Sequence, residues 1–587
     1  MPSLQRHRTE PVPRLADASH PTSRPAARPG AFEWIPAAAI FFLTAVGLQW
    51  KAGAFAVEFG SHPDESAHYV TGLMIRDYLV AIVSGHFTSP LAYAENYYVH
   101  YPKVAFGMWP PLFHLTEALW TLIFSPGRIS ILLLMALITT AIATSIFLVL
   151  RRQYPMLGAF AGAAMFMVLP LVQASTQTVM ADSLVALLDF WAMIFLIGYL
   201  DQERTRDAVL FGVCAGLSMA TKANGVALVL MPIFAILVTQ RFHLLRQRGL
   251  YYAGAVILVL GVPWQVLSYY LIKRSQTVPP DFLQERFALG LYYGKVLLAS
   301  LGWGLAPFFV LGIAIFLIRL WRKQPDVTLA CAFALVLSVW IYHSILLFGE
   351  DRYLLGALPP AILFAAAGFA WTVRRISALT LSPAARSAAL GALAVGVVAL
   401  QPWAVPHKPY QGFDQPASFL ASAREFADDN FLVVSDAMGE GAFISEVAMH
   451  EQRPGHIILR SSKFLSTSRW NGANYQMRFQ SAKELRELLD HAPIDAVILD
   501  TRTGQPGDQE AAFHLQEQVA LALVSNPNWR YRDGYPKLPD HGPWISLYTR
   551  VGPRPPGDIR LDMRYTLSHD IVYTDSERSQ EHPAAAH

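Results

Sequence analysis

The stretch ILLLMALITTAIATSIFLVL, at residues 131–150, contains no charged residue and is long enough to cross a bilayer as a single helix. Only 15% of the 587 residues are charged, whereas an average soluble domain carries about 25%. Nearly charge-free stretches recur along much of the chain, at residues 35–48, 157–172, 184–200, 226–239, 251–267, 297–318, 328–348, 353–371 and 387–400. The sequence therefore predicts a polytopic α-helical membrane protein.

Basic residues predict the orientation of these helices. They gather before the first apolar run and in short loops after later runs, and the positive-inside rule places such loops in the cytosol. The apolar segment 208–238 would measure about 46 Å as one helix, which exceeds a hydrocarbon core of about 30 Å. Lys222 lies inside it beside the turn signal Asn224-Gly225, so we expect a hairpin with Lys222 at its outer tip. This gives about eleven transmembrane helices in an inner or plasma membrane, with a cytosolic N-terminus and an extracytoplasmic C-terminus.

Composition divides the chain along its length. Residues 1–33 lack an apolar period and predict a disordered cytosolic tail. Residues 34–404 form the predicted membrane domain, whose large first outer loop covers residues 51–127. Residues 405–564 are more polar and predict an extracytoplasmic α/β domain, and residues 565–587 predict a second disordered tail.

Short patterns predict the elements of this outer domain. Apolar runs of a few residues indicate buried strands, and amphipathic periodicity indicates helices. The predicted strands are 431–434, 456–459 and 496–499, and the predicted helices are 416–428, 481–490 and 509–523. In the first outer loop, helical apolar spacing from Tyr69 to Val83 predicts a helix along the membrane surface.

The stretch HPDESAH, at residues 62–68, places two adjacent carboxylates in the first outer loop. One interpretation is structural, because proline followed by acidic residues is typical of a helix start, where the helix dipole stabilises a carboxylate by about 0.3–1 kcal/mol. The functional interpretation makes Asp64 a general base that takes a proton from an acceptor hydroxyl. His68 lies four residues later on the same helical face, where it would orient or pair with the acid.

A second cluster precedes the next apolar run, with HYPK at residues 100–103 and MWPPLFH at residues 108–114. Prolines and aromatic residues are common at membrane interfaces without any further role. The alternative is a pocket for a sugar and a phosphate, in which Trp109 stacks on the sugar ring and Lys103 neutralises a phosphate leaving group. The spacing does not decide between these interpretations.

Asp182, Lys222 and Arg352 are isolated charges at the outer ends of predicted spans. An ionisable group at membrane depth is costly, which makes each of them a candidate for function. The alternative is that the long side chains of Lys222 and Arg352 reach the interface, where water solvates their charge. A common position with Asp64 at one side of the bundle would favour the functional interpretation.

The sequence offers little for a cofactor. The two cysteines, Cys214 and Cys331, both lie inside apolar runs and predict neither a disulfide framework nor a zinc site. Asp64 and Glu65 leave a divalent metal ion as an open alternative, but the remaining ligand set is too small to predict one. The net charge of +3 comes with Lys and Arg residues in short loops and predicts no nucleic-acid partner.

Together these motifs resemble the membrane glycosyltransferases of the GT-C fold, particularly the superfamily of protein O-mannosyltransferases and lipid A aminoarabinose transferases. The matching motifs, in chain order, are Asp64-Glu65, Pro110-Pro111-Leu112, Asp182, the run from Gly216 to Lys222, Arg352-Tyr353-Leu354-Leu355 and Pro359-Pro360. The resemblance covers residues 34–372 and leaves the outer domain unmatched. Trp109 departs from the family, which often has a histidine before the two prolines.

The resemblance implies an inverting hexosyl- or pentosyltransferase that moves a sugar from a polyprenyl-phosphate donor to a lipid, protein or glycan acceptor on the extracytoplasmic face. Such a donor suits the predicted topology, because its lipid lies in the bilayer and its phosphate lies at the interface, where Lys and Arg stabilise it. By position, the family assigns Asp64 as the base, Glu65, Lys103 and His114 as pocket residues, and Lys222 and Arg352 as contacts of the lipid phosphate. To these we add His68, Trp109 and Asp182 as substrate contacts.

The alternative is a transporter or flippase of a lipid-linked sugar. Such a protein would show internal repeats and discontinuous helices that meet at mid-membrane. The sequence shows no repeat, and its candidate charges gather at one face, which favours the enzyme.

Overall fold

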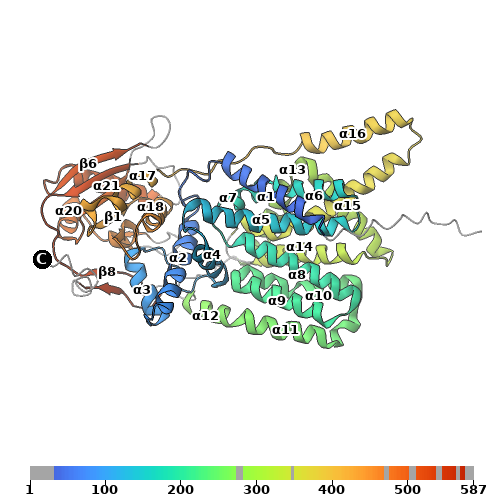
Figure 1. The fold of residues 1–587 in the computed structure, drawn as a ribbon, viewed down its shortest axis with the longest axis horizontal. Coiled ribbons are helices and arrows are strands. Elements are labelled where there is room, and N and C mark those ends of the chain that lie inside the picture. Colours follow the sequence, from blue (N-terminus) through green and yellow to red (C-terminus); the bar gives the residue numbers. More distant parts are fainter. Residues whose placement is uncertain are drawn as a thin grey trace, which may run out of the picture.

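The computed structural model describes residues 32–272, 282–345, 349–467, 475–501, 510–536, 545–563, 567 and 569–574. Of the two segments expected to be disordered, residues 1–31 of the first lie outside the described residues. In the second, 565–587, residues 567 and 569–574 are described, and strand β9 (Ile571–Tyr573) pairs with β8 (Ile559–Leu561), which contradicts the expected disorder there. The described chain forms a long helical bundle with an α/β region at one end (Figure 1).

Helices cover the apolar runs that predicted membrane spans. Seven helical segments of the described chain are long and apolar enough to cross a bilayer, or eight if the bent pair α6 and α7 is one span. The seven are α1 (Trp34–Lys51), α5 (Arg128–Arg151), α8 (Asp182–Gln202), α11 with α12 (Arg248–Leu260 and Val262–Ile272), α13 (Phe282–Trp321), α14 (Val327–Ile345), and η3 with α15 (Asp351–Ala357 and Leu358–Ser377). The remaining helices of the bundle are α4 (Leu112–Ile123), α6 (Met156–Met167), α7 (Pro170–Gln177), α9 (Thr205–Thr221), η1 (Ala223–Val229), α10 (Met231–Thr239), η2 (Phe242–Arg246) and α16 (Pro383–Ala399). The polytopic helical fold is confirmed. The expected count of about eleven spans also included apolar runs that form shorter helices in the structure.

The segment 208–238 divides at Lys222, where the sequence predicts a turn. α9 ends at Thr221, and Lys222 has an extended backbone. The chain then returns closely along α9, because a Cβ atom added to Gly225 would lie 2.4 Å from the amide nitrogen of Met219. Glycine is required at so close a return of the backbone, and the two arms hold Lys222 at their junction.

Two glycines allow α13 and α15 to approach each other closely. A Cβ atom added to Gly312 would lie 2.0 Å from the carbonyl oxygen of Phe364, and one added to Gly368 would lie 2.1 Å from that of Phe308. Small residues at helix interfaces are typical of membrane bundles, where close van der Waals packing drives helix association.

The α/β region is built on a five-stranded sheet with the order β2-β1-β5-β7-β6. β1 is parallel to β2 and β5, whereas β7 is antiparallel to β5 and β6. Every residue of β1 and β5 is buried, as expected for central strands with a mostly apolar sequence. The strands are β1 (Asn430–Val434), β2 (Ile457–Arg460), β3 (Ser466–Thr467), β4 (Gln476–Met477), β5 (Ala496–Asp500), β6 (Trp529–Tyr535), β7 (Ile545–Arg550), β8 (Ile559–Leu561) and β9 (Ile571–Tyr573).

Helices flank this sheet, and they are α17 (Asp414–Ser422), η4 (Arg424–Phe426), α18 (Ala437–His450), α19 (Ser461–Phe464), α20 (Ala482–His491) and α21 (Glu510–Val524). The three predicted strands and the three predicted helices of this region are confirmed. No sequence pattern predicted α18 or the antiparallel pair β6 and β7.

The first outer loop lies between the bundle and the α/β region (Figure 1). It forms α2 (Pro63–Val83) and α3 (Pro90–His100), and α2 packs against both α4 and α18. Two ion pairs join the parts: Arg128 lies 2.6 Å from Glu446, and Arg453 lies 2.8 Å from Asp77. The start of α2, which carries Asp64, is therefore enclosed by elements from three parts of the chain.

Replacing Gly368 by alanine should lower the thermal stability of the protein. The added methyl group would press against the backbone of α13, and we expect a loss of about 1–3 kcal/mol. Gly391→Ala on α16 is the matched control, because no atom lies within 4 Å of an added Cβ there. Alanine has the better helix propensity, so the control should melt at an equal or higher temperature. Apparent melting temperatures in detergent test the pair, and equal values for both variants would contradict the close helix packing.

Candidate functional site

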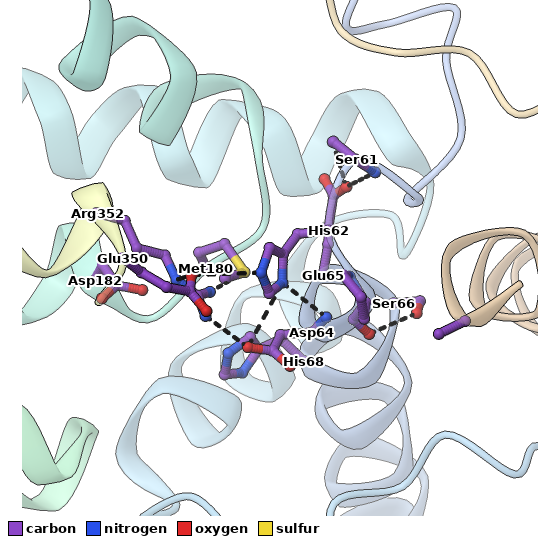
Figure 2. A network of polar contacts seen from close by, with 12 residues as sticks. Ser61, His62, Asp64, Glu65, Ser66, His68, Met180, Asp182, Glu350 and Arg352 are labelled. Atoms are coloured by element: carbon purple, nitrogen blue, oxygen red, sulfur yellow. Dashed lines mark hydrogen bonds and ion pairs between the residues drawn. The ribbon is translucent and has the colours of Figure 1, made fainter. Parts of the chain in front are cut away.

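Asp64 lies in the first turn of α2. His62 caps this helix, since its Nδ1 atom accepts a hydrogen bond from the Asp64 amide at 3.1 Å, and Pro63 is the first helical residue. The carboxylate of Asp64 has a different partner, because its Oδ2 atom accepts a hydrogen bond from Nη2 of Arg352 at 2.8 Å (Figure 2). The predicted helix start is therefore present, and the ion pair adds to it.

The guanidinium of Arg352, in η3, lies between two carboxylates. Besides Asp64, its Nε atom lies 2.7 Å from Oε2 of Glu350, and its Nη1 atom donates to the thioether of Met180 at 3.6 Å. Glu350 also lies 3.5 Å from Nε2 of His62. Burial raises the pKa of Glu350, but the His62 hydrogen bond and the Arg352 charge outweigh it and lower the pKa to about 2. Glu350 is therefore an anion at neutral pH.

Lys222 and Asp182 form a second ion pair beside the first. The Lys222 Nζ atom lies 2.8 and 2.9 Å from the two carboxylate oxygens of Asp182, and both side chains are buried. The two cations face the same ring, since Nζ of Lys222 lies 5.0 Å and Cζ of Arg352 lies 5.5 Å from the centroid of Tyr353. The structure thus brings together four predicted residues, which we name the ion-pair cluster: Asp64, Asp182, Lys222 and Arg352.

Three aromatic and imidazole rings lie next to this cluster. The ring of His68 stacks on Trp109 with centroids 4.1 Å apart, and its Nδ1 atom lies 2.9 Å from Nε2 of His114. Burial lowers the pKa of His68 well below its ordinary value, and the nearby cations Lys222 and Arg352 lower it further. His68 is therefore neutral, and Figure 2 shows it beside Asp64.

Glu65 turns away from the cluster, although it follows Asp64 directly. Its Oε2 atom accepts hydrogen bonds from the amide and hydroxyl of Ser61 at 2.9 and 2.7 Å. Its Oε1 atom accepts from the amide of Val179 at 3.2 Å and from Nζ of Lys408 at 2.6 Å. Both oxygens of this carboxylate are bound by groups of the protein, so the structure does not place Glu65 in a substrate pocket.

Lys103 faces the α/β region instead of the ion-pair cluster. Its Nζ atom donates to the carbonyl of Ala437, at the start of α18, at 3.0 Å, and to the carbonyl of Pro63 at 3.4 Å. Burial lowers the pKa of Lys103 to about 7, and the nearby charge of Arg460 acts in the same direction. Of the three cations expected around the phosphate, only Lys222 and Arg352 belong to the ion-pair cluster.

Three contributors to the site were not predicted as site residues: Glu350, Tyr353 and Lys408, although Tyr353 belongs to the motif at residues 352–355. Glu350 and Tyr353 flank Arg352, and their proximity in sequence was a usable signal. Lys408 carried no such signal, because it lies 343 residues from its partner Glu65. Among the residues that the structure describes, no group of three or more His, Cys, Asp and Glu side chains is arranged to hold a metal ion.

The stability of the protein should depend on Lys103 at alkaline pH. Its folded pKa of about 7 lies below the ordinary value of 10.5, so the unfolded chain binds more protons between these two values. The free energy of unfolding should therefore rise with pH between these two values, by at most about 1.4 kcal/mol per pH unit. Below the folded pKa, Lys103 should contribute no pH dependence to the free energy of unfolding. Lys103→Met should lose that part of the rise in melting temperature.

Lys483→Met is the control, because the Lys483 side chain is 87% exposed. It should keep the pH dependence of the wild-type protein. A Lys103→Met variant with an unchanged pH profile would contradict the burial of a neutral amine at this position.

Part of the bundle matches a known family by sequence. The family described as dolichyl-phosphate-mannose-protein mannosyltransferase matches residues 109–267, a segment that begins at Trp109 and includes the Asp182–Lys222 pair. No curated protein sequence matches the chain.

Solved structures match nearly the whole chain. ArnT from Cupriavidus metallidurans in the apo state has a TM-score of 0.58 and 12% identity, and the match covers 87% of this chain and 97% of that chain. ArnT bound to undecaprenyl phosphate has a TM-score of 0.54 and 13% identity, with 88% and 98% covered. The Archaeoglobus fulgidus oligosaccharyltransferase tethered with an acceptor peptide has a TM-score of 0.52 and 12% identity, with 86% and 74% covered. Identities this low concern the fold, and the chain has the GT-C fold of membrane glycosyltransferases that its motifs indicate.

Proposed function

We propose that this protein is an inverting glycosyltransferase that moves a sugar from a polyprenyl-phosphate donor to an acceptor hydroxyl. The observation that carries the proposal is the ion-pair cluster, in which a carboxylate, Asp64, lies within one network with two cations, Arg352 and Lys222. Such a network combines a proton acceptor with a phosphate-binding surface. The same fold holds undecaprenyl phosphate in ArnT, which supports a lipid phosphate as the carrier.

Asp64 acts as the base in this reaction. The acceptor hydroxyl gives its proton to the carboxylate while its oxygen attacks the anomeric carbon of the sugar. The bond between that carbon and the phosphate oxygen breaks, and the polyprenyl phosphate leaves with the bonding electrons. A single displacement of this kind inverts the anomeric configuration. Positioning and charge stabilisation supply most of the rate.

Lys222 and Arg352 bind the phosphate of the donor. A lysine ammonium has three N–H donors, and the two oxygens of Asp182 engage two of them. The Nη1 atom of Arg352 reaches the thioether of Met180, which is a weak acceptor. Each cation therefore keeps an N–H for a phosphate oxygen, where negative charge grows as the glycosidic bond breaks.

The rings beside the cluster bind the sugar. Trp109 offers an aromatic face for stacking, and His114 holds the ring of His68 through the contact between their nitrogens. The Nε2 atom of His68 is buried without a hydrogen-bond partner in the described chain. Buried polar atoms are rarely left unpaired, so we assign Nε2 to a sugar hydroxyl.

Two helices support the orientation of this site. α5 begins at Arg128, which pairs with Glu446 of the α/β region, and it ends at Arg151. The helix formed by η3 and α15 begins beside the cluster and carries Arg374 and Arg375 in its last turn. The positive-inside rule assigns these basic ends to the cytosol. The cluster and the α/β region then face the extracytoplasmic side of an inner or plasma membrane, where a lipid, a protein or a glycan serves as the acceptor.

Asp64→Asn should abolish transfer while the protein stays folded, because asparagine keeps the shape of the side chain. We expect turnover to fall by at least about 100-fold, the usual contribution of a general base. The assay follows release of polyprenyl phosphate from a synthetic polyprenyl-phosphoryl sugar by the purified protein. Glu95→Gln, in α3 of the same outer loop, is the matched control and should stay active, since Glu95 pairs with His569 outside the cluster. Near-normal turnover by a folded Asp64→Asn protein would remove Asp64 from the mechanism.

Replacing Asp182 and Lys222 together by Asn and Met should weaken donor binding without leaving an unpaired buried charge. We expect the KM for the donor to rise by at least about tenfold, since one phosphate contact is lost. The control replaces a buried ion pair outside the cluster, as Arg128→Met with Glu446→Gln, and should keep the KM.

An unchanged donor KM in the Asp182 and Lys222 double variant would contradict the phosphate role.

Liposomes separate the enzyme from a flippase, because a flippase moves the lipid-linked sugar between leaflets without cleaving it. We expect cleavage of the donor by the wild-type protein in that assay.

A further inference from the structure

The carboxylate of Glu65 ties together three segments of the chain. Its Oε2 atom binds the amide and hydroxyl of Ser61, which fixes the start of α2. Its Oε1 atom binds the amide of Val179, between α7 and α8, and the ammonium of Lys408, between α16 and α17. The side chains of Glu65 and Lys408 are 0% and 1% exposed, so water does not compete for these contacts.

Lys408 is itself held on two sides. Its amide donates to the carbonyl of Ala52, just after α1, at 3.0 Å. Its ammonium lies 2.6 Å from Glu65 and 4.9 Å from the centroid of the Phe59 ring. A lysine so fully buried needs its charge compensated, and Glu65 provides the compensation. The segment that leads into the α/β region is therefore anchored beside Asp64.

The contact with Val179 extends this anchor to the ion-pair cluster. Met180 follows directly and contacts Arg352, and Asp182 lies two residues further along and binds Lys222. Glu65 thus holds the helix start that carries Asp64 against the segment that carries Asp182. Displacements of about 1 Å between reacting groups cost enzymes about 100-fold in rate.

We infer that Lys408 is a positioning residue, which acts through Glu65 to set the distance between Asp64 and the Asp182–Lys222 pair. The inference rests on the proposed function, because it gives Lys408 a purpose only if Asp64 works with those cations. Lys408 contacts neither Asp64 nor Lys222 in the described contacts. Its loss should therefore reduce turnover and leave the binding of the donor phosphate largely intact.

The experiment compares three variants in the transfer assay and in thermal melting. Lys408→Met leaves the Glu65 carboxylate buried without its cation, so both turnover and melting temperature should fall, with turnover lower by at least about tenfold. Lys408→Met with Glu65→Gln removes the unpaired charge and should recover much of the melting temperature. Turnover should stay low in this double variant, because the link between the segments is still missing. The donor KM should change by less than about threefold in both.

Arg453→Met is the matched control for docking of the α/β region in general. Arg453 pairs with Asp77 at 2.8 Å and also joins this region to α2, but at a position further along the helix. It should lower the melting temperature and keep turnover. Equal losses of turnover in Arg453→Met and Lys408→Met would overturn the specific role of Lys408.

The remaining outcomes also decide the matter. Turnover within about twofold of wild type in Lys408→Met, or full recovery of turnover together with stability in the double variant, would overturn the inference. Should Lys408→Met fail to fold, the double variant alone still tests it. An active Asp64→Asn protein would instead defeat the proposed function, whereas an inactive Asp64→Asn protein beside a normal Lys408→Met protein defeats only the inference.

Discussion

The ion pair between Asp64 and Arg352 is the contact on which the arrangement of this chain depends. It joins residues 288 positions apart, one at the start of α2 and the other in η3. Both side chains are mostly buried, at 20% and 14% exposure, so each charge compensates the other where water reaches them little. The His62 cap, the Glu350 carboxylate and the Tyr353 ring hold the two partners in place. Beside it, Asp182 and Lys222 form a second buried ion pair, so the two pairs together concentrate charge at one end of the bundle.

The α/β region is attached to that end by polar contacts with buried members. Glu446 reaches the start of α5, Arg453 reaches α2, and Arg460 donates to the carbonyl of Pro102 at 3.3 Å. Glu58, in the first outer loop, accepts hydrogen bonds from the amides of Gln411 and Phe413 at 3.0 Å each. Contacts of this kind fix a relative orientation more strictly than an apolar surface does, because each requires a defined geometry. The first outer loop is thereby held from both sides.

Local patterns predicted most of the fold. Apolar runs indicated the helices of the bundle, and the strands at 431–434 and 496–499 followed from short apolar segments that are buried on both faces. The four residues of the ion-pair cluster were predicted because charge is rare in apolar surroundings, a signal that needs no knowledge of the partner. The roles expected for Glu65 and Lys103 in a substrate pocket stay predictions, because these two side chains face Lys408 and the α/β region instead of the ion-pair cluster. Which way a side chain turns depends on partners brought in by the fold, and nothing in the local sequence of the first outer loop indicates residues more than 300 positions away.

The anchoring of Lys408 has a consequence for how the chain can be divided. A fragment ending after the bundle would remove groups that bind two carboxylates of the first outer loop. Glu65 would lose the ammonium of Lys408, and Glu58 would lose the amide of Gln411. The complementary fragment would expose the apolar and charged surface of α18 that rests on α2. Exchange of the outer half for another fold would therefore require new partners for these two carboxylates of the first outer loop.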